Sequence, residues 1–164
     1  MKPVRIRQVK KEIRLLGLAA SRVDAVYAVV GVVYRGGLAV DGVLCSVSSS
    51  PDLTAAATGM IRASVHFNQI RVAAVDLDGL PAGACLDLDG LASGTGKPVL
   101  GLTRASVELD ERHMFRWRGY TVTCVGLRRG DAEGVLGVCS VDGAPEALRV
   151  AAMVAGGLPA LHKV

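Results

Sequence analysis

The chain has 164 residues, of which 51% are hydrophobic, 21% are charged and 4% are aromatic. This length and composition exclude a disordered chain and predict a single domain, residues 1–164, that is large enough to bury a core. No apolar run approaches the roughly 20 residues of a membrane-spanning helix. The basic N-terminus also lacks the apolar segment of a signal peptide. We therefore expect a cytoplasmic protein with no membrane partner.

The net charge of +4 is concentrated in two regions of the chain. The N-terminal region holds Lys2, Arg5, Arg7, Lys10, Lys11 and Arg14. The second region holds Arg112, Arg116, Arg118, Arg128 and Arg129. Clusters of this kind are either solvated surface or contacts for phosphate groups, so nucleic acid is a partner that the sequence allows.

Short apolar runs in the first half of the chain predict strands. The runs over residues 13–19, 25–34 and 38–47 predict an antiparallel meander, because Arg35-Gly36-Gly37 is typical of a hairpin turn. A helix is expected over 53–66, a strand over 70–77, a short helix over 86–93 and a strand over 97–103. This order is typical of parallel strands joined by right-handed crossovers.

The second half of the chain continues this alternation. We expect a helix over 107–117, a strand over 120–127, a further strand over 134–141 and a terminal helix over 145–156 that ends at Gly156-Gly157. The fold class is therefore α/β, with a mixed sheet flanked by helices.

Cysteine and histidine offer no metal site by spacing. The four cysteines lie in apolar runs and are expected to be buried, and the three histidines are isolated. Residues 94–97 (GTGK) do not form a phosphate loop, because proline and a strand follow the lysine in place of a helix.

The strand over 70–77 ends in the best candidate for a site. In an open α/β sheet, ligands collect where parallel strands have their carboxyl ends. Alternation points Asp76 and Asp78 to opposite faces, so they do not form a carboxylate pair. Asp78, next to Gly79, is the better candidate, and the alternative is that it only stabilises the following turn.

Two further residues are candidates by their place in the sequence. Arg104 ends the neighbouring strand, so it is expected to share a rim with Asp78, either holding a phosphate beside a metal or forming a salt bridge with Asp78. Asp52 precedes the helix over 53–66 and either caps that helix or belongs to the site. Asp87 and Asp89, in the first turn of the next helix, are expected to be structural.

These residues and several motifs together resemble a known archaeal family. The motifs are residues 14–18 (RLLGL), 30–37 (VGVVYRGG), 41–44 (DGVL), 69–72 (QIRV), 78–79 (DG), 82–83 (AG) and 145–151 (PEALRVA). Over nearly its full length the chain resembles the archaeal domain-of-unknown-function family ninety-nine, which is similar to endonuclease V and has a ribonuclease H-like fold. Residues 98–104 (PVLGLTR) resemble the proline-to-lysine strand of endonuclease V, with Arg104 in the place of the lysine.

The resemblance implies metal-dependent cleavage of phosphodiester bonds. It would place Mg²⁺ or Mn²⁺ on Asp78 and Asp52, with Arg104, Arg112 and Arg116 contacting nucleic acid. However, where the family reads Gly-Ile-Asp-Asp on its first strand, this chain reads Gly17-Leu-Ala-Ala20, and alanine cannot bind a metal.

Three functions therefore stay open. The first is a nucleic-acid-binding protein with a degenerate nuclease site, which the loss of the acid at Ala19 favours. The second is an active endonuclease that uses a rearranged acid such as Asp24. The third is a non-catalytic interaction module or homo-oligomer, which the low aromatic content mildly favours over a surface for base stacking.

Overall fold

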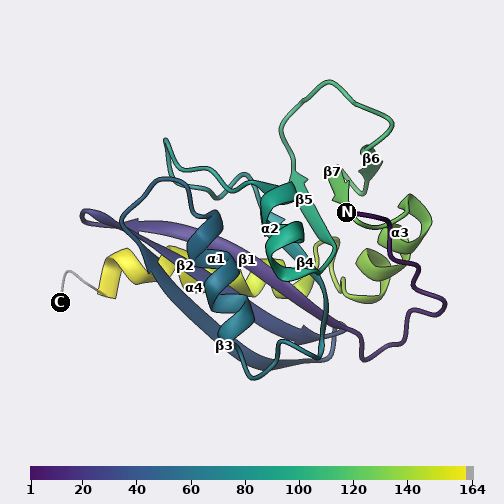
Figure 1. The fold of residues 1–164 in the computed structure, drawn as a ribbon, viewed down its shortest axis with the longest axis horizontal. Helices are drawn as coiled ribbons and strands as arrows, with labels where there is room; N and C mark the ends of the chain where they lie inside the picture. Colours follow the sequence, from purple (N-terminus) through teal and green to yellow (C-terminus); the bar gives the residue numbers. More distant parts are fainter. Residues whose placement is uncertain (162–164) are drawn as a thin grey trace.

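A computed structural model describes residues 1–161, in which seven strands form one mixed sheet and four helices flank it (Figure 1). In chain order the elements are β1 (Arg14–Val23), β2 (Val26–Arg35), β3 (Ala39–Ser48), α1 (Thr54–Ala63), β4 (Ile70–Asp76), α2 (Leu88–Thr95), β5 (Val99–Thr103), β6 (Met114–Trp117), β7 (Tyr120–Val125), α3 (Arg129–Val138) and α4 (Glu146–Leu161). Across the sheet the strands lie in the order β3-β2-β1-β4-β5-β7-β6. Within residues 1–161, no helix is long and apolar enough to cross a membrane.

The predicted meander and the parallel strands are confirmed. The first three strands pair antiparallel, and β1, β4 and β5 run parallel to one another in the middle of the sheet. The turn between β2 and β3 requires glycine at Gly36, because its φ is +55° and a Cβ there would lie 1.8 Å from the carbonyl oxygen of Lys11. The other side of the sheet is closed by the antiparallel strands β7 and β6.

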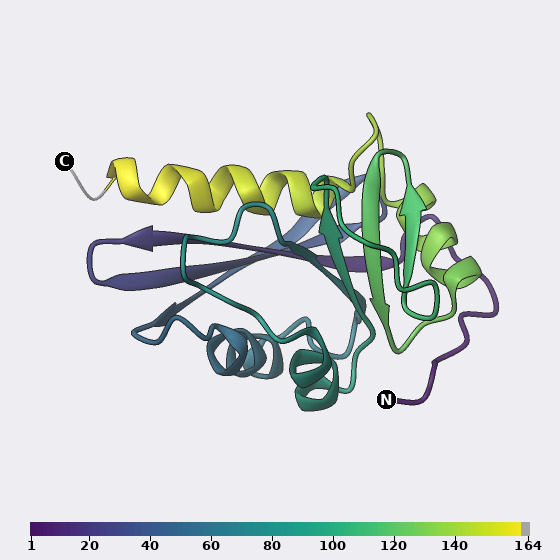
Figure 2. The same ribbon diagram turned by 90° about the horizontal axis from the view of Figure 1, so that it is seen from above.

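Helices cover both faces of the sheet. Figure 2 shows α4 along one face, and α1 and α2 on the opposite face. Small residues bring α4 very close to β1: a Cβ on Gly17 would lie 2.2 Å from the carbonyl oxygen of Ala147. Farther along, Ala151 and Ala155 of α4 pack against Ala19. The helix therefore lies directly over the end of β1, where the family's first acidic residue is expected.

The prediction of a helix over 107–117 is wrong. Residues 114–117 form the edge strand β6, which pairs antiparallel with β7. The connection is a two-residue hairpin turn, Arg118-Gly119, in which both residues have positive φ, as a type I′ turn requires. Along β6, Phe115 is buried and Arg116 is exposed, so the alternation has the two-residue period of a strand.

The prediction of a strand over 134–141 is also wrong, because residues Arg129–Val138 form α3. Its fully buried residues, Ala132, Val135 and Leu136, have the i, i+3, i+4 spacing of one helix face. Cys124 and Cys139 are buried as expected, but Cys45 and Cys85 are exposed.

The terminal helix does not end at Gly156-Gly157. It continues to Leu161 and contains Pro159. A glycine in a helix costs only about 1 kcal/mol, and the packing of α4 along β1 and β2 outweighs that cost.

Candidate functional site

The carboxyl ends of the parallel strands β1, β4 and β5 meet at one rim of the sheet. Leu18 pairs with Val75 and Asp76 pairs with Leu102, so the residues that follow these pairs lie side by side. The rim therefore brings together Ala19, Asp76 and the end of β5, as expected for the ligand-binding edge of such a sheet.

Asp78 connects the loop after β4 to the end of β5. One carboxylate oxygen accepts a hydrogen bond from the Thr103 hydroxyl, and the other accepts one from the backbone N–H of Arg104 at 2.7 Å. Asp78 and Arg104 thus share a rim, but the contact is to the backbone of Arg104. Within residues 1–161, no ion pair joins the two side chains.

The Arg104 side chain belongs to a stack of arginine and aromatic side chains that the sequence did not predict. Its guanidinium lies 4.3 Å from the centroid of the Tyr120 ring and donates a hydrogen bond to the Tyr120 hydroxyl at 3.0 Å. Tyr120 stacks on Trp117 with 6.5 Å between centroids, and Arg118 lies 4.8 Å from the Trp117 ring. The detectable signal was the hairpin sequence WRGY at 117–120, which the expected helix obscured.

The other two arginines predicted to contact nucleic acid lie elsewhere. Arg116 pairs with Thr121, one position from the pair Trp117–Tyr120, so it points to the opposite face of the sheet from that stack. Arg112 lines a separate hollow of about 480 Å³ together with Asp110 and His113. The three arginines therefore do not form one patch.

Asp52 stabilises the first turn of α1. Its Oδ1 accepts hydrogen bonds from the backbone N–H of Thr54 at 3.0 Å and from the Thr54 hydroxyl at 2.7 Å. These bonds favour the ionised form and lower the pKa of Asp52. The helix that Asp52 begins lies on the face opposite α4 (Figure 2).

Asp76, and not the expected Asp78, is the carboxylate that lies in a hollow at the rim. The hollow has a volume of about 370 Å³ between the end of β1, the loop after β4 and the middle of α4. It is lined by Ala19, Ala20, Ser21, Arg22, Asp76, Gly79, Pro81, Ala152, Ala155 and Gly156. Burial raises the pKa of Asp76, although its Oδ1 accepts a hydrogen bond from the Gly79 N–H at 3.2 Å.

These residues do not fit a divalent metal ion. Among the described residues, Asp76 is the only carboxylate that lines the hollow, and Arg22 brings a positive charge to the same wall. Both oxygens of Asp78 already accept hydrogen bonds, and Ala19 and Ala20 provide no oxygen ligand. Within residues 1–161, no three histidine, cysteine or acidic residues lie together as a metal site needs. Because Mg²⁺ takes oxygen ligands in strict geometry, a single carboxylate makes a poor site.

Comparison with known proteins agrees with this fold. No family model matches the chain. A UPF0215 protein of Methanosarcina mazei is 31% identical over 183 aligned positions, which cover 92% of each chain. A second UPF0215 protein, of Methanothermobacter thermautotrophicus, is 29% identical over 186 positions, covering 93% of this chain and 90% of the relative.

Solved structures share the architecture at low sequence identity. A protein of unknown function from Archaeoglobus fulgidus superposes with a TM-score of 0.76 and 23% identity, covering 88% of this chain and 97% of the other. Human endonuclease V superposes with a TM-score of 0.65 and 14% identity, covering 93% of this chain and 86% of the human chain. The expected resemblance to an archaeal family with an endonuclease V-like fold is thereby confirmed. The chain belongs to the UPF0215 family, whose function is unknown, and it has the fold of endonuclease V.

Proposed function

We propose that this protein binds nucleic acid at the rim formed by β1, β4 and β5 and does not cleave it by metal-dependent hydrolysis. The observation that carries the proposal is the composition of the rim. Arginine and aromatic side chains lie at the rim, but among the described residues Asp76 is the only carboxylate that lines the hollow beside Ala19 and Ala20, and both oxygens of Asp78 already accept hydrogen bonds. The likeness to endonuclease V supports nucleic acid as the ligand class.

Arg104 is suited to contact a phosphate group. A guanidinium has five N–H donors, and one of them is used by the Tyr120 hydroxyl. The stacking on Tyr120 holds the group in place, which reduces the loss of side-chain entropy on binding. Tyr120 is buried, at 8% exposed, so it positions Arg104, and the half-buried Trp117 is the aromatic side chain that can stack on an unpaired base.

Hydrolysis is not expected at this rim. In metal-dependent nucleases the ion activates water and stabilises the charge of the transition state. Here Asp76 is the only carboxylate among the described residues that line the hollow, and its neighbours on β1 are the methyl groups of Ala19 and Ala20. The residues of the rim can therefore hold a phosphodiester more readily than they can activate water against it.

The proposal is tested by separating binding from cleavage. Fluorescence anisotropy with short labelled strands of RNA and DNA, single or paired and with or without inosine, should show binding that weakens with salt. Arg104→Gln should weaken binding about five- to tenfold, in the range of one lost phosphate contact. The matched control is Arg62→Gln, which removes the same charge from α1 on the opposite face (Figure 2).

The same strands incubated with Mg²⁺ or Mn²⁺ should remain intact on a denaturing gel. Cleavage that disappears in Asp76→Asn or Asp78→Asn would establish the active endonuclease instead. Failure of every strand to bind the wild-type protein would refute the proposal. Asp24 is the acid that an active endonuclease would use in place of one at position 19. It lies at the turn between β1 and β2, about 16 Å along the strand from Ala19 at roughly 3.3 Å per residue.

A second candidate function rests on the edge strand β3. Its valines Val43 and Val47 are 56% and 63% exposed, and within residues 1–161 no strand pairs with its outer backbone groups. An exposed apolar edge of this kind favours pairing with a second copy of the chain about a two-fold axis. Light scattering should then report a dimer that Val43→Lys converts to a monomer, whereas a monomeric wild-type protein would exclude this candidate.

A further inference from the structure

A basic groove lies where the parallel strands begin, at the opposite end of these strands from the rim. It consists of two adjoining hollows, of about 490 and 220 Å³, which share Ile6 and Arg71 in their walls. The N-terminal segment forms one wall, and the starts of β1 and β4 form the other. Volumes of this order are typical of sites for small organic ligands.

Positive charge dominates the walls of this groove. Lys10, Arg14 and Arg71 line the larger hollow, and Lys97 joins Arg71 in the smaller one. One carboxylate, that of Glu12, also lines the larger hollow. Among the ion pairs of residues 1–161, none involves Lys10, Arg71 or Lys97.

Arg71 and Lys97 lie close enough to repel each other. Burial lowers the pKa of the Lys97 ammonium, and the nearby charge of Arg71 lowers it further. The ammonium rests 4.5 Å from the centroid of the Phe67 ring, which fixes its position. Two cations that are held together without a carboxylate between them are stabilised when an anion binds.

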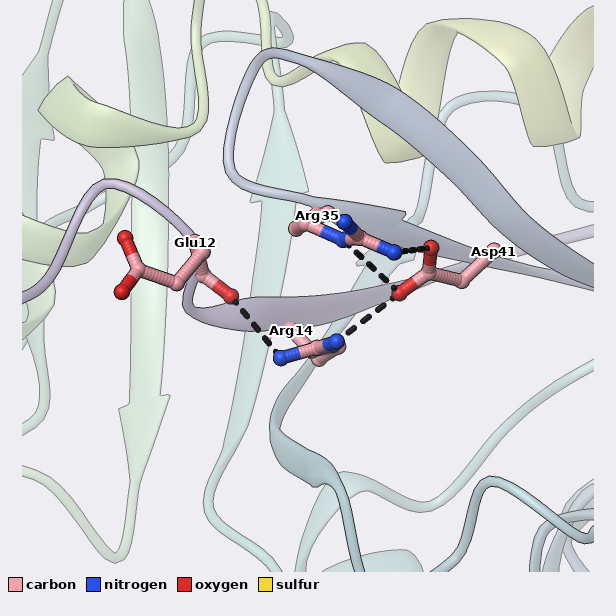
Figure 3. A network of polar contacts seen from close by, with 4 residues as sticks. All are labelled: Glu12, Arg14, Arg35 and Asp41. Carbon is pink, nitrogen blue, oxygen red and sulfur yellow. Dashed lines mark hydrogen bonds and ion pairs between the residues drawn. The ribbon is translucent and has the colours of Figure 1, made fainter.

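Arg14 is held in place at the other end of the groove. Its Nε donates to Asp41 at 3.0 Å, and Arg35 donates to the same carboxylate at 2.7 Å (Figure 3). The Glu12 carbonyl accepts a weaker bond from Arg14 at 3.5 Å, while the Glu12 carboxylate points away from that guanidinium (Figure 3). Asp41 is thus shared by two arginines and Glu12 does not neutralise Arg14, so excess positive charge remains.

Neutral hydrogen-bonding groups lie among the cations. Gln8, Asn68 and Gln69 line the larger hollow beside Lys10 and Arg14. Each amide offers both donors and an acceptor, whereas the lysine and arginine side chains have donors only. The larger hollow can therefore bind a polar uncharged group next to an anionic one.

We propose that this groove binds a ligand that carries two or more adjacent phosphate groups and is about the size of a nucleotide. Arg14 and Arg71 would hold phosphate oxygens through paired N–H donors, and Lys97 would add a point charge in the smaller hollow. The amides of the larger hollow would contact the rest of the ligand. This site lies at the opposite end of the parallel strands from Arg104 and does not rest on the function proposed for the rim.

The ligand chemistry could come from a free nucleotide or from the backbone of a strand, and calorimetry on the full chain distinguishes the two. The probes are inorganic triphosphate, ATP, and a short single-stranded oligonucleotide at low salt. We expect binding of triphosphate and ATP, weakened at least tenfold in Arg71→Gln. The control Arg7→Gln removes the same charge from the N-terminal segment outside the groove, and it should change affinity less than twofold.

The outcomes separate this proposal from that for the rim. Equal effects of Arg71→Gln and Arg7→Gln on every probe, or no binding of any probe by the wild-type protein, would overturn it. If only the oligonucleotide binds and Arg71→Gln weakens it, the phosphates come from a strand. Loss of oligonucleotide binding in Arg104→Gln with unchanged ATP binding would show that the two sites act independently. Thermal melting of each variant without ligand verifies that it is folded.

Discussion

The variant Ala19→Asp restores an acidic residue where the family carries one, and it tests whether this position decides the chemistry of the rim. Ala19 is 3% exposed and lies beside Asp76 on the neighbouring strand, with both residues lining the same hollow. Adjacent strands are about 4.8 Å apart, so the new carboxylate would lie about 5 Å from that of Asp76. At an effective dielectric constant of about 20, two such charges repel by about 3 kcal/mol.

This repulsion should lower the free energy of unfolding at neutral pH. For a chain of this length, about 3 kcal/mol corresponds to a fall of about 6–12 °C in Tm. The loss should become smaller as the pH falls, because protonation of either carboxyl group removes the repulsion. Two carboxylates at this spacing can also share a divalent ion, so Mn²⁺ should raise the Tm of the variant by several degrees and leave the wild-type Tm unchanged.

The assay is thermal melting with and without Mn²⁺ at two pH values. The matched control is Ala57→Asp, which places a carboxylate at a fully buried alanine on α1. That variant should also be destabilised, but Mn²⁺ should not rescue it. If Mn²⁺ stabilises Ala19→Asp no more than Ala57→Asp, the missing acid is not what prevents metal binding at the rim.

Two further variants test the roles of the carboxylates at the rim. Burial raises the pKa of Asp76, so the folded protein retains its proton at pH values where the unfolded chain has lost it, and stability falls as pH rises through that range. Asp76→Asn should remove this fall in stability, whose slope is at most about 1.4 kcal/mol per pH unit. Urea unfolding from pH 4 to 7 measures the slope. An unchanged slope in the variant would contradict the assignment of the fall to Asp76. Asp78→Ala loses the hydrogen bonds from Thr103 and Arg104 and should cost about 1–2 kcal/mol in urea unfolding. Its affinity for nucleic acid should fall less than that of Arg104→Gln, and the reverse order would make Asp78 a binding residue.

The sheet was predictable where local signals and burial agree. The central residues of the runs that became β1, β2, β4 and β5 are apolar because they are covered on both faces, and glycine in the turn after β2 marks the hairpin. In the second half these signals compete. Residues 129–138 contain three glycines, which disguise the helical spacing of Ala132, Val135 and Leu136. Tertiary packing decides such segments, and propensity alone does not.

The rim that holds the candidate site was predictable from the sequence, but the side chains that line it were not. Chain order placed Asp78 and Arg104 at neighbouring strand ends, and both residues lie there. Which carboxylate faces the hollow depends on how α4 covers the end of β1, and that contact involves residues more than 120 positions apart. The aromatic partners of Arg104 were missed for a local reason, because the first strand of their hairpin was predicted to be a helix.

The two aspartates after β4 illustrate how a short motif can point to the wrong carboxylate. An aspartate followed by glycine attracts attention, but the hydrogen-bond acceptors of Asp78 are occupied at the end of β5. Two residues earlier, Asp76 ends the strand on the face covered by α4, next to Ala19. Strand alternation requires that a carboxylate at position 19 and one at position 76 share this face. With alanine at position 19, Asp76 therefore has no carboxylate partner on β1, which is why we propose binding without metal-dependent cleavage at this rim.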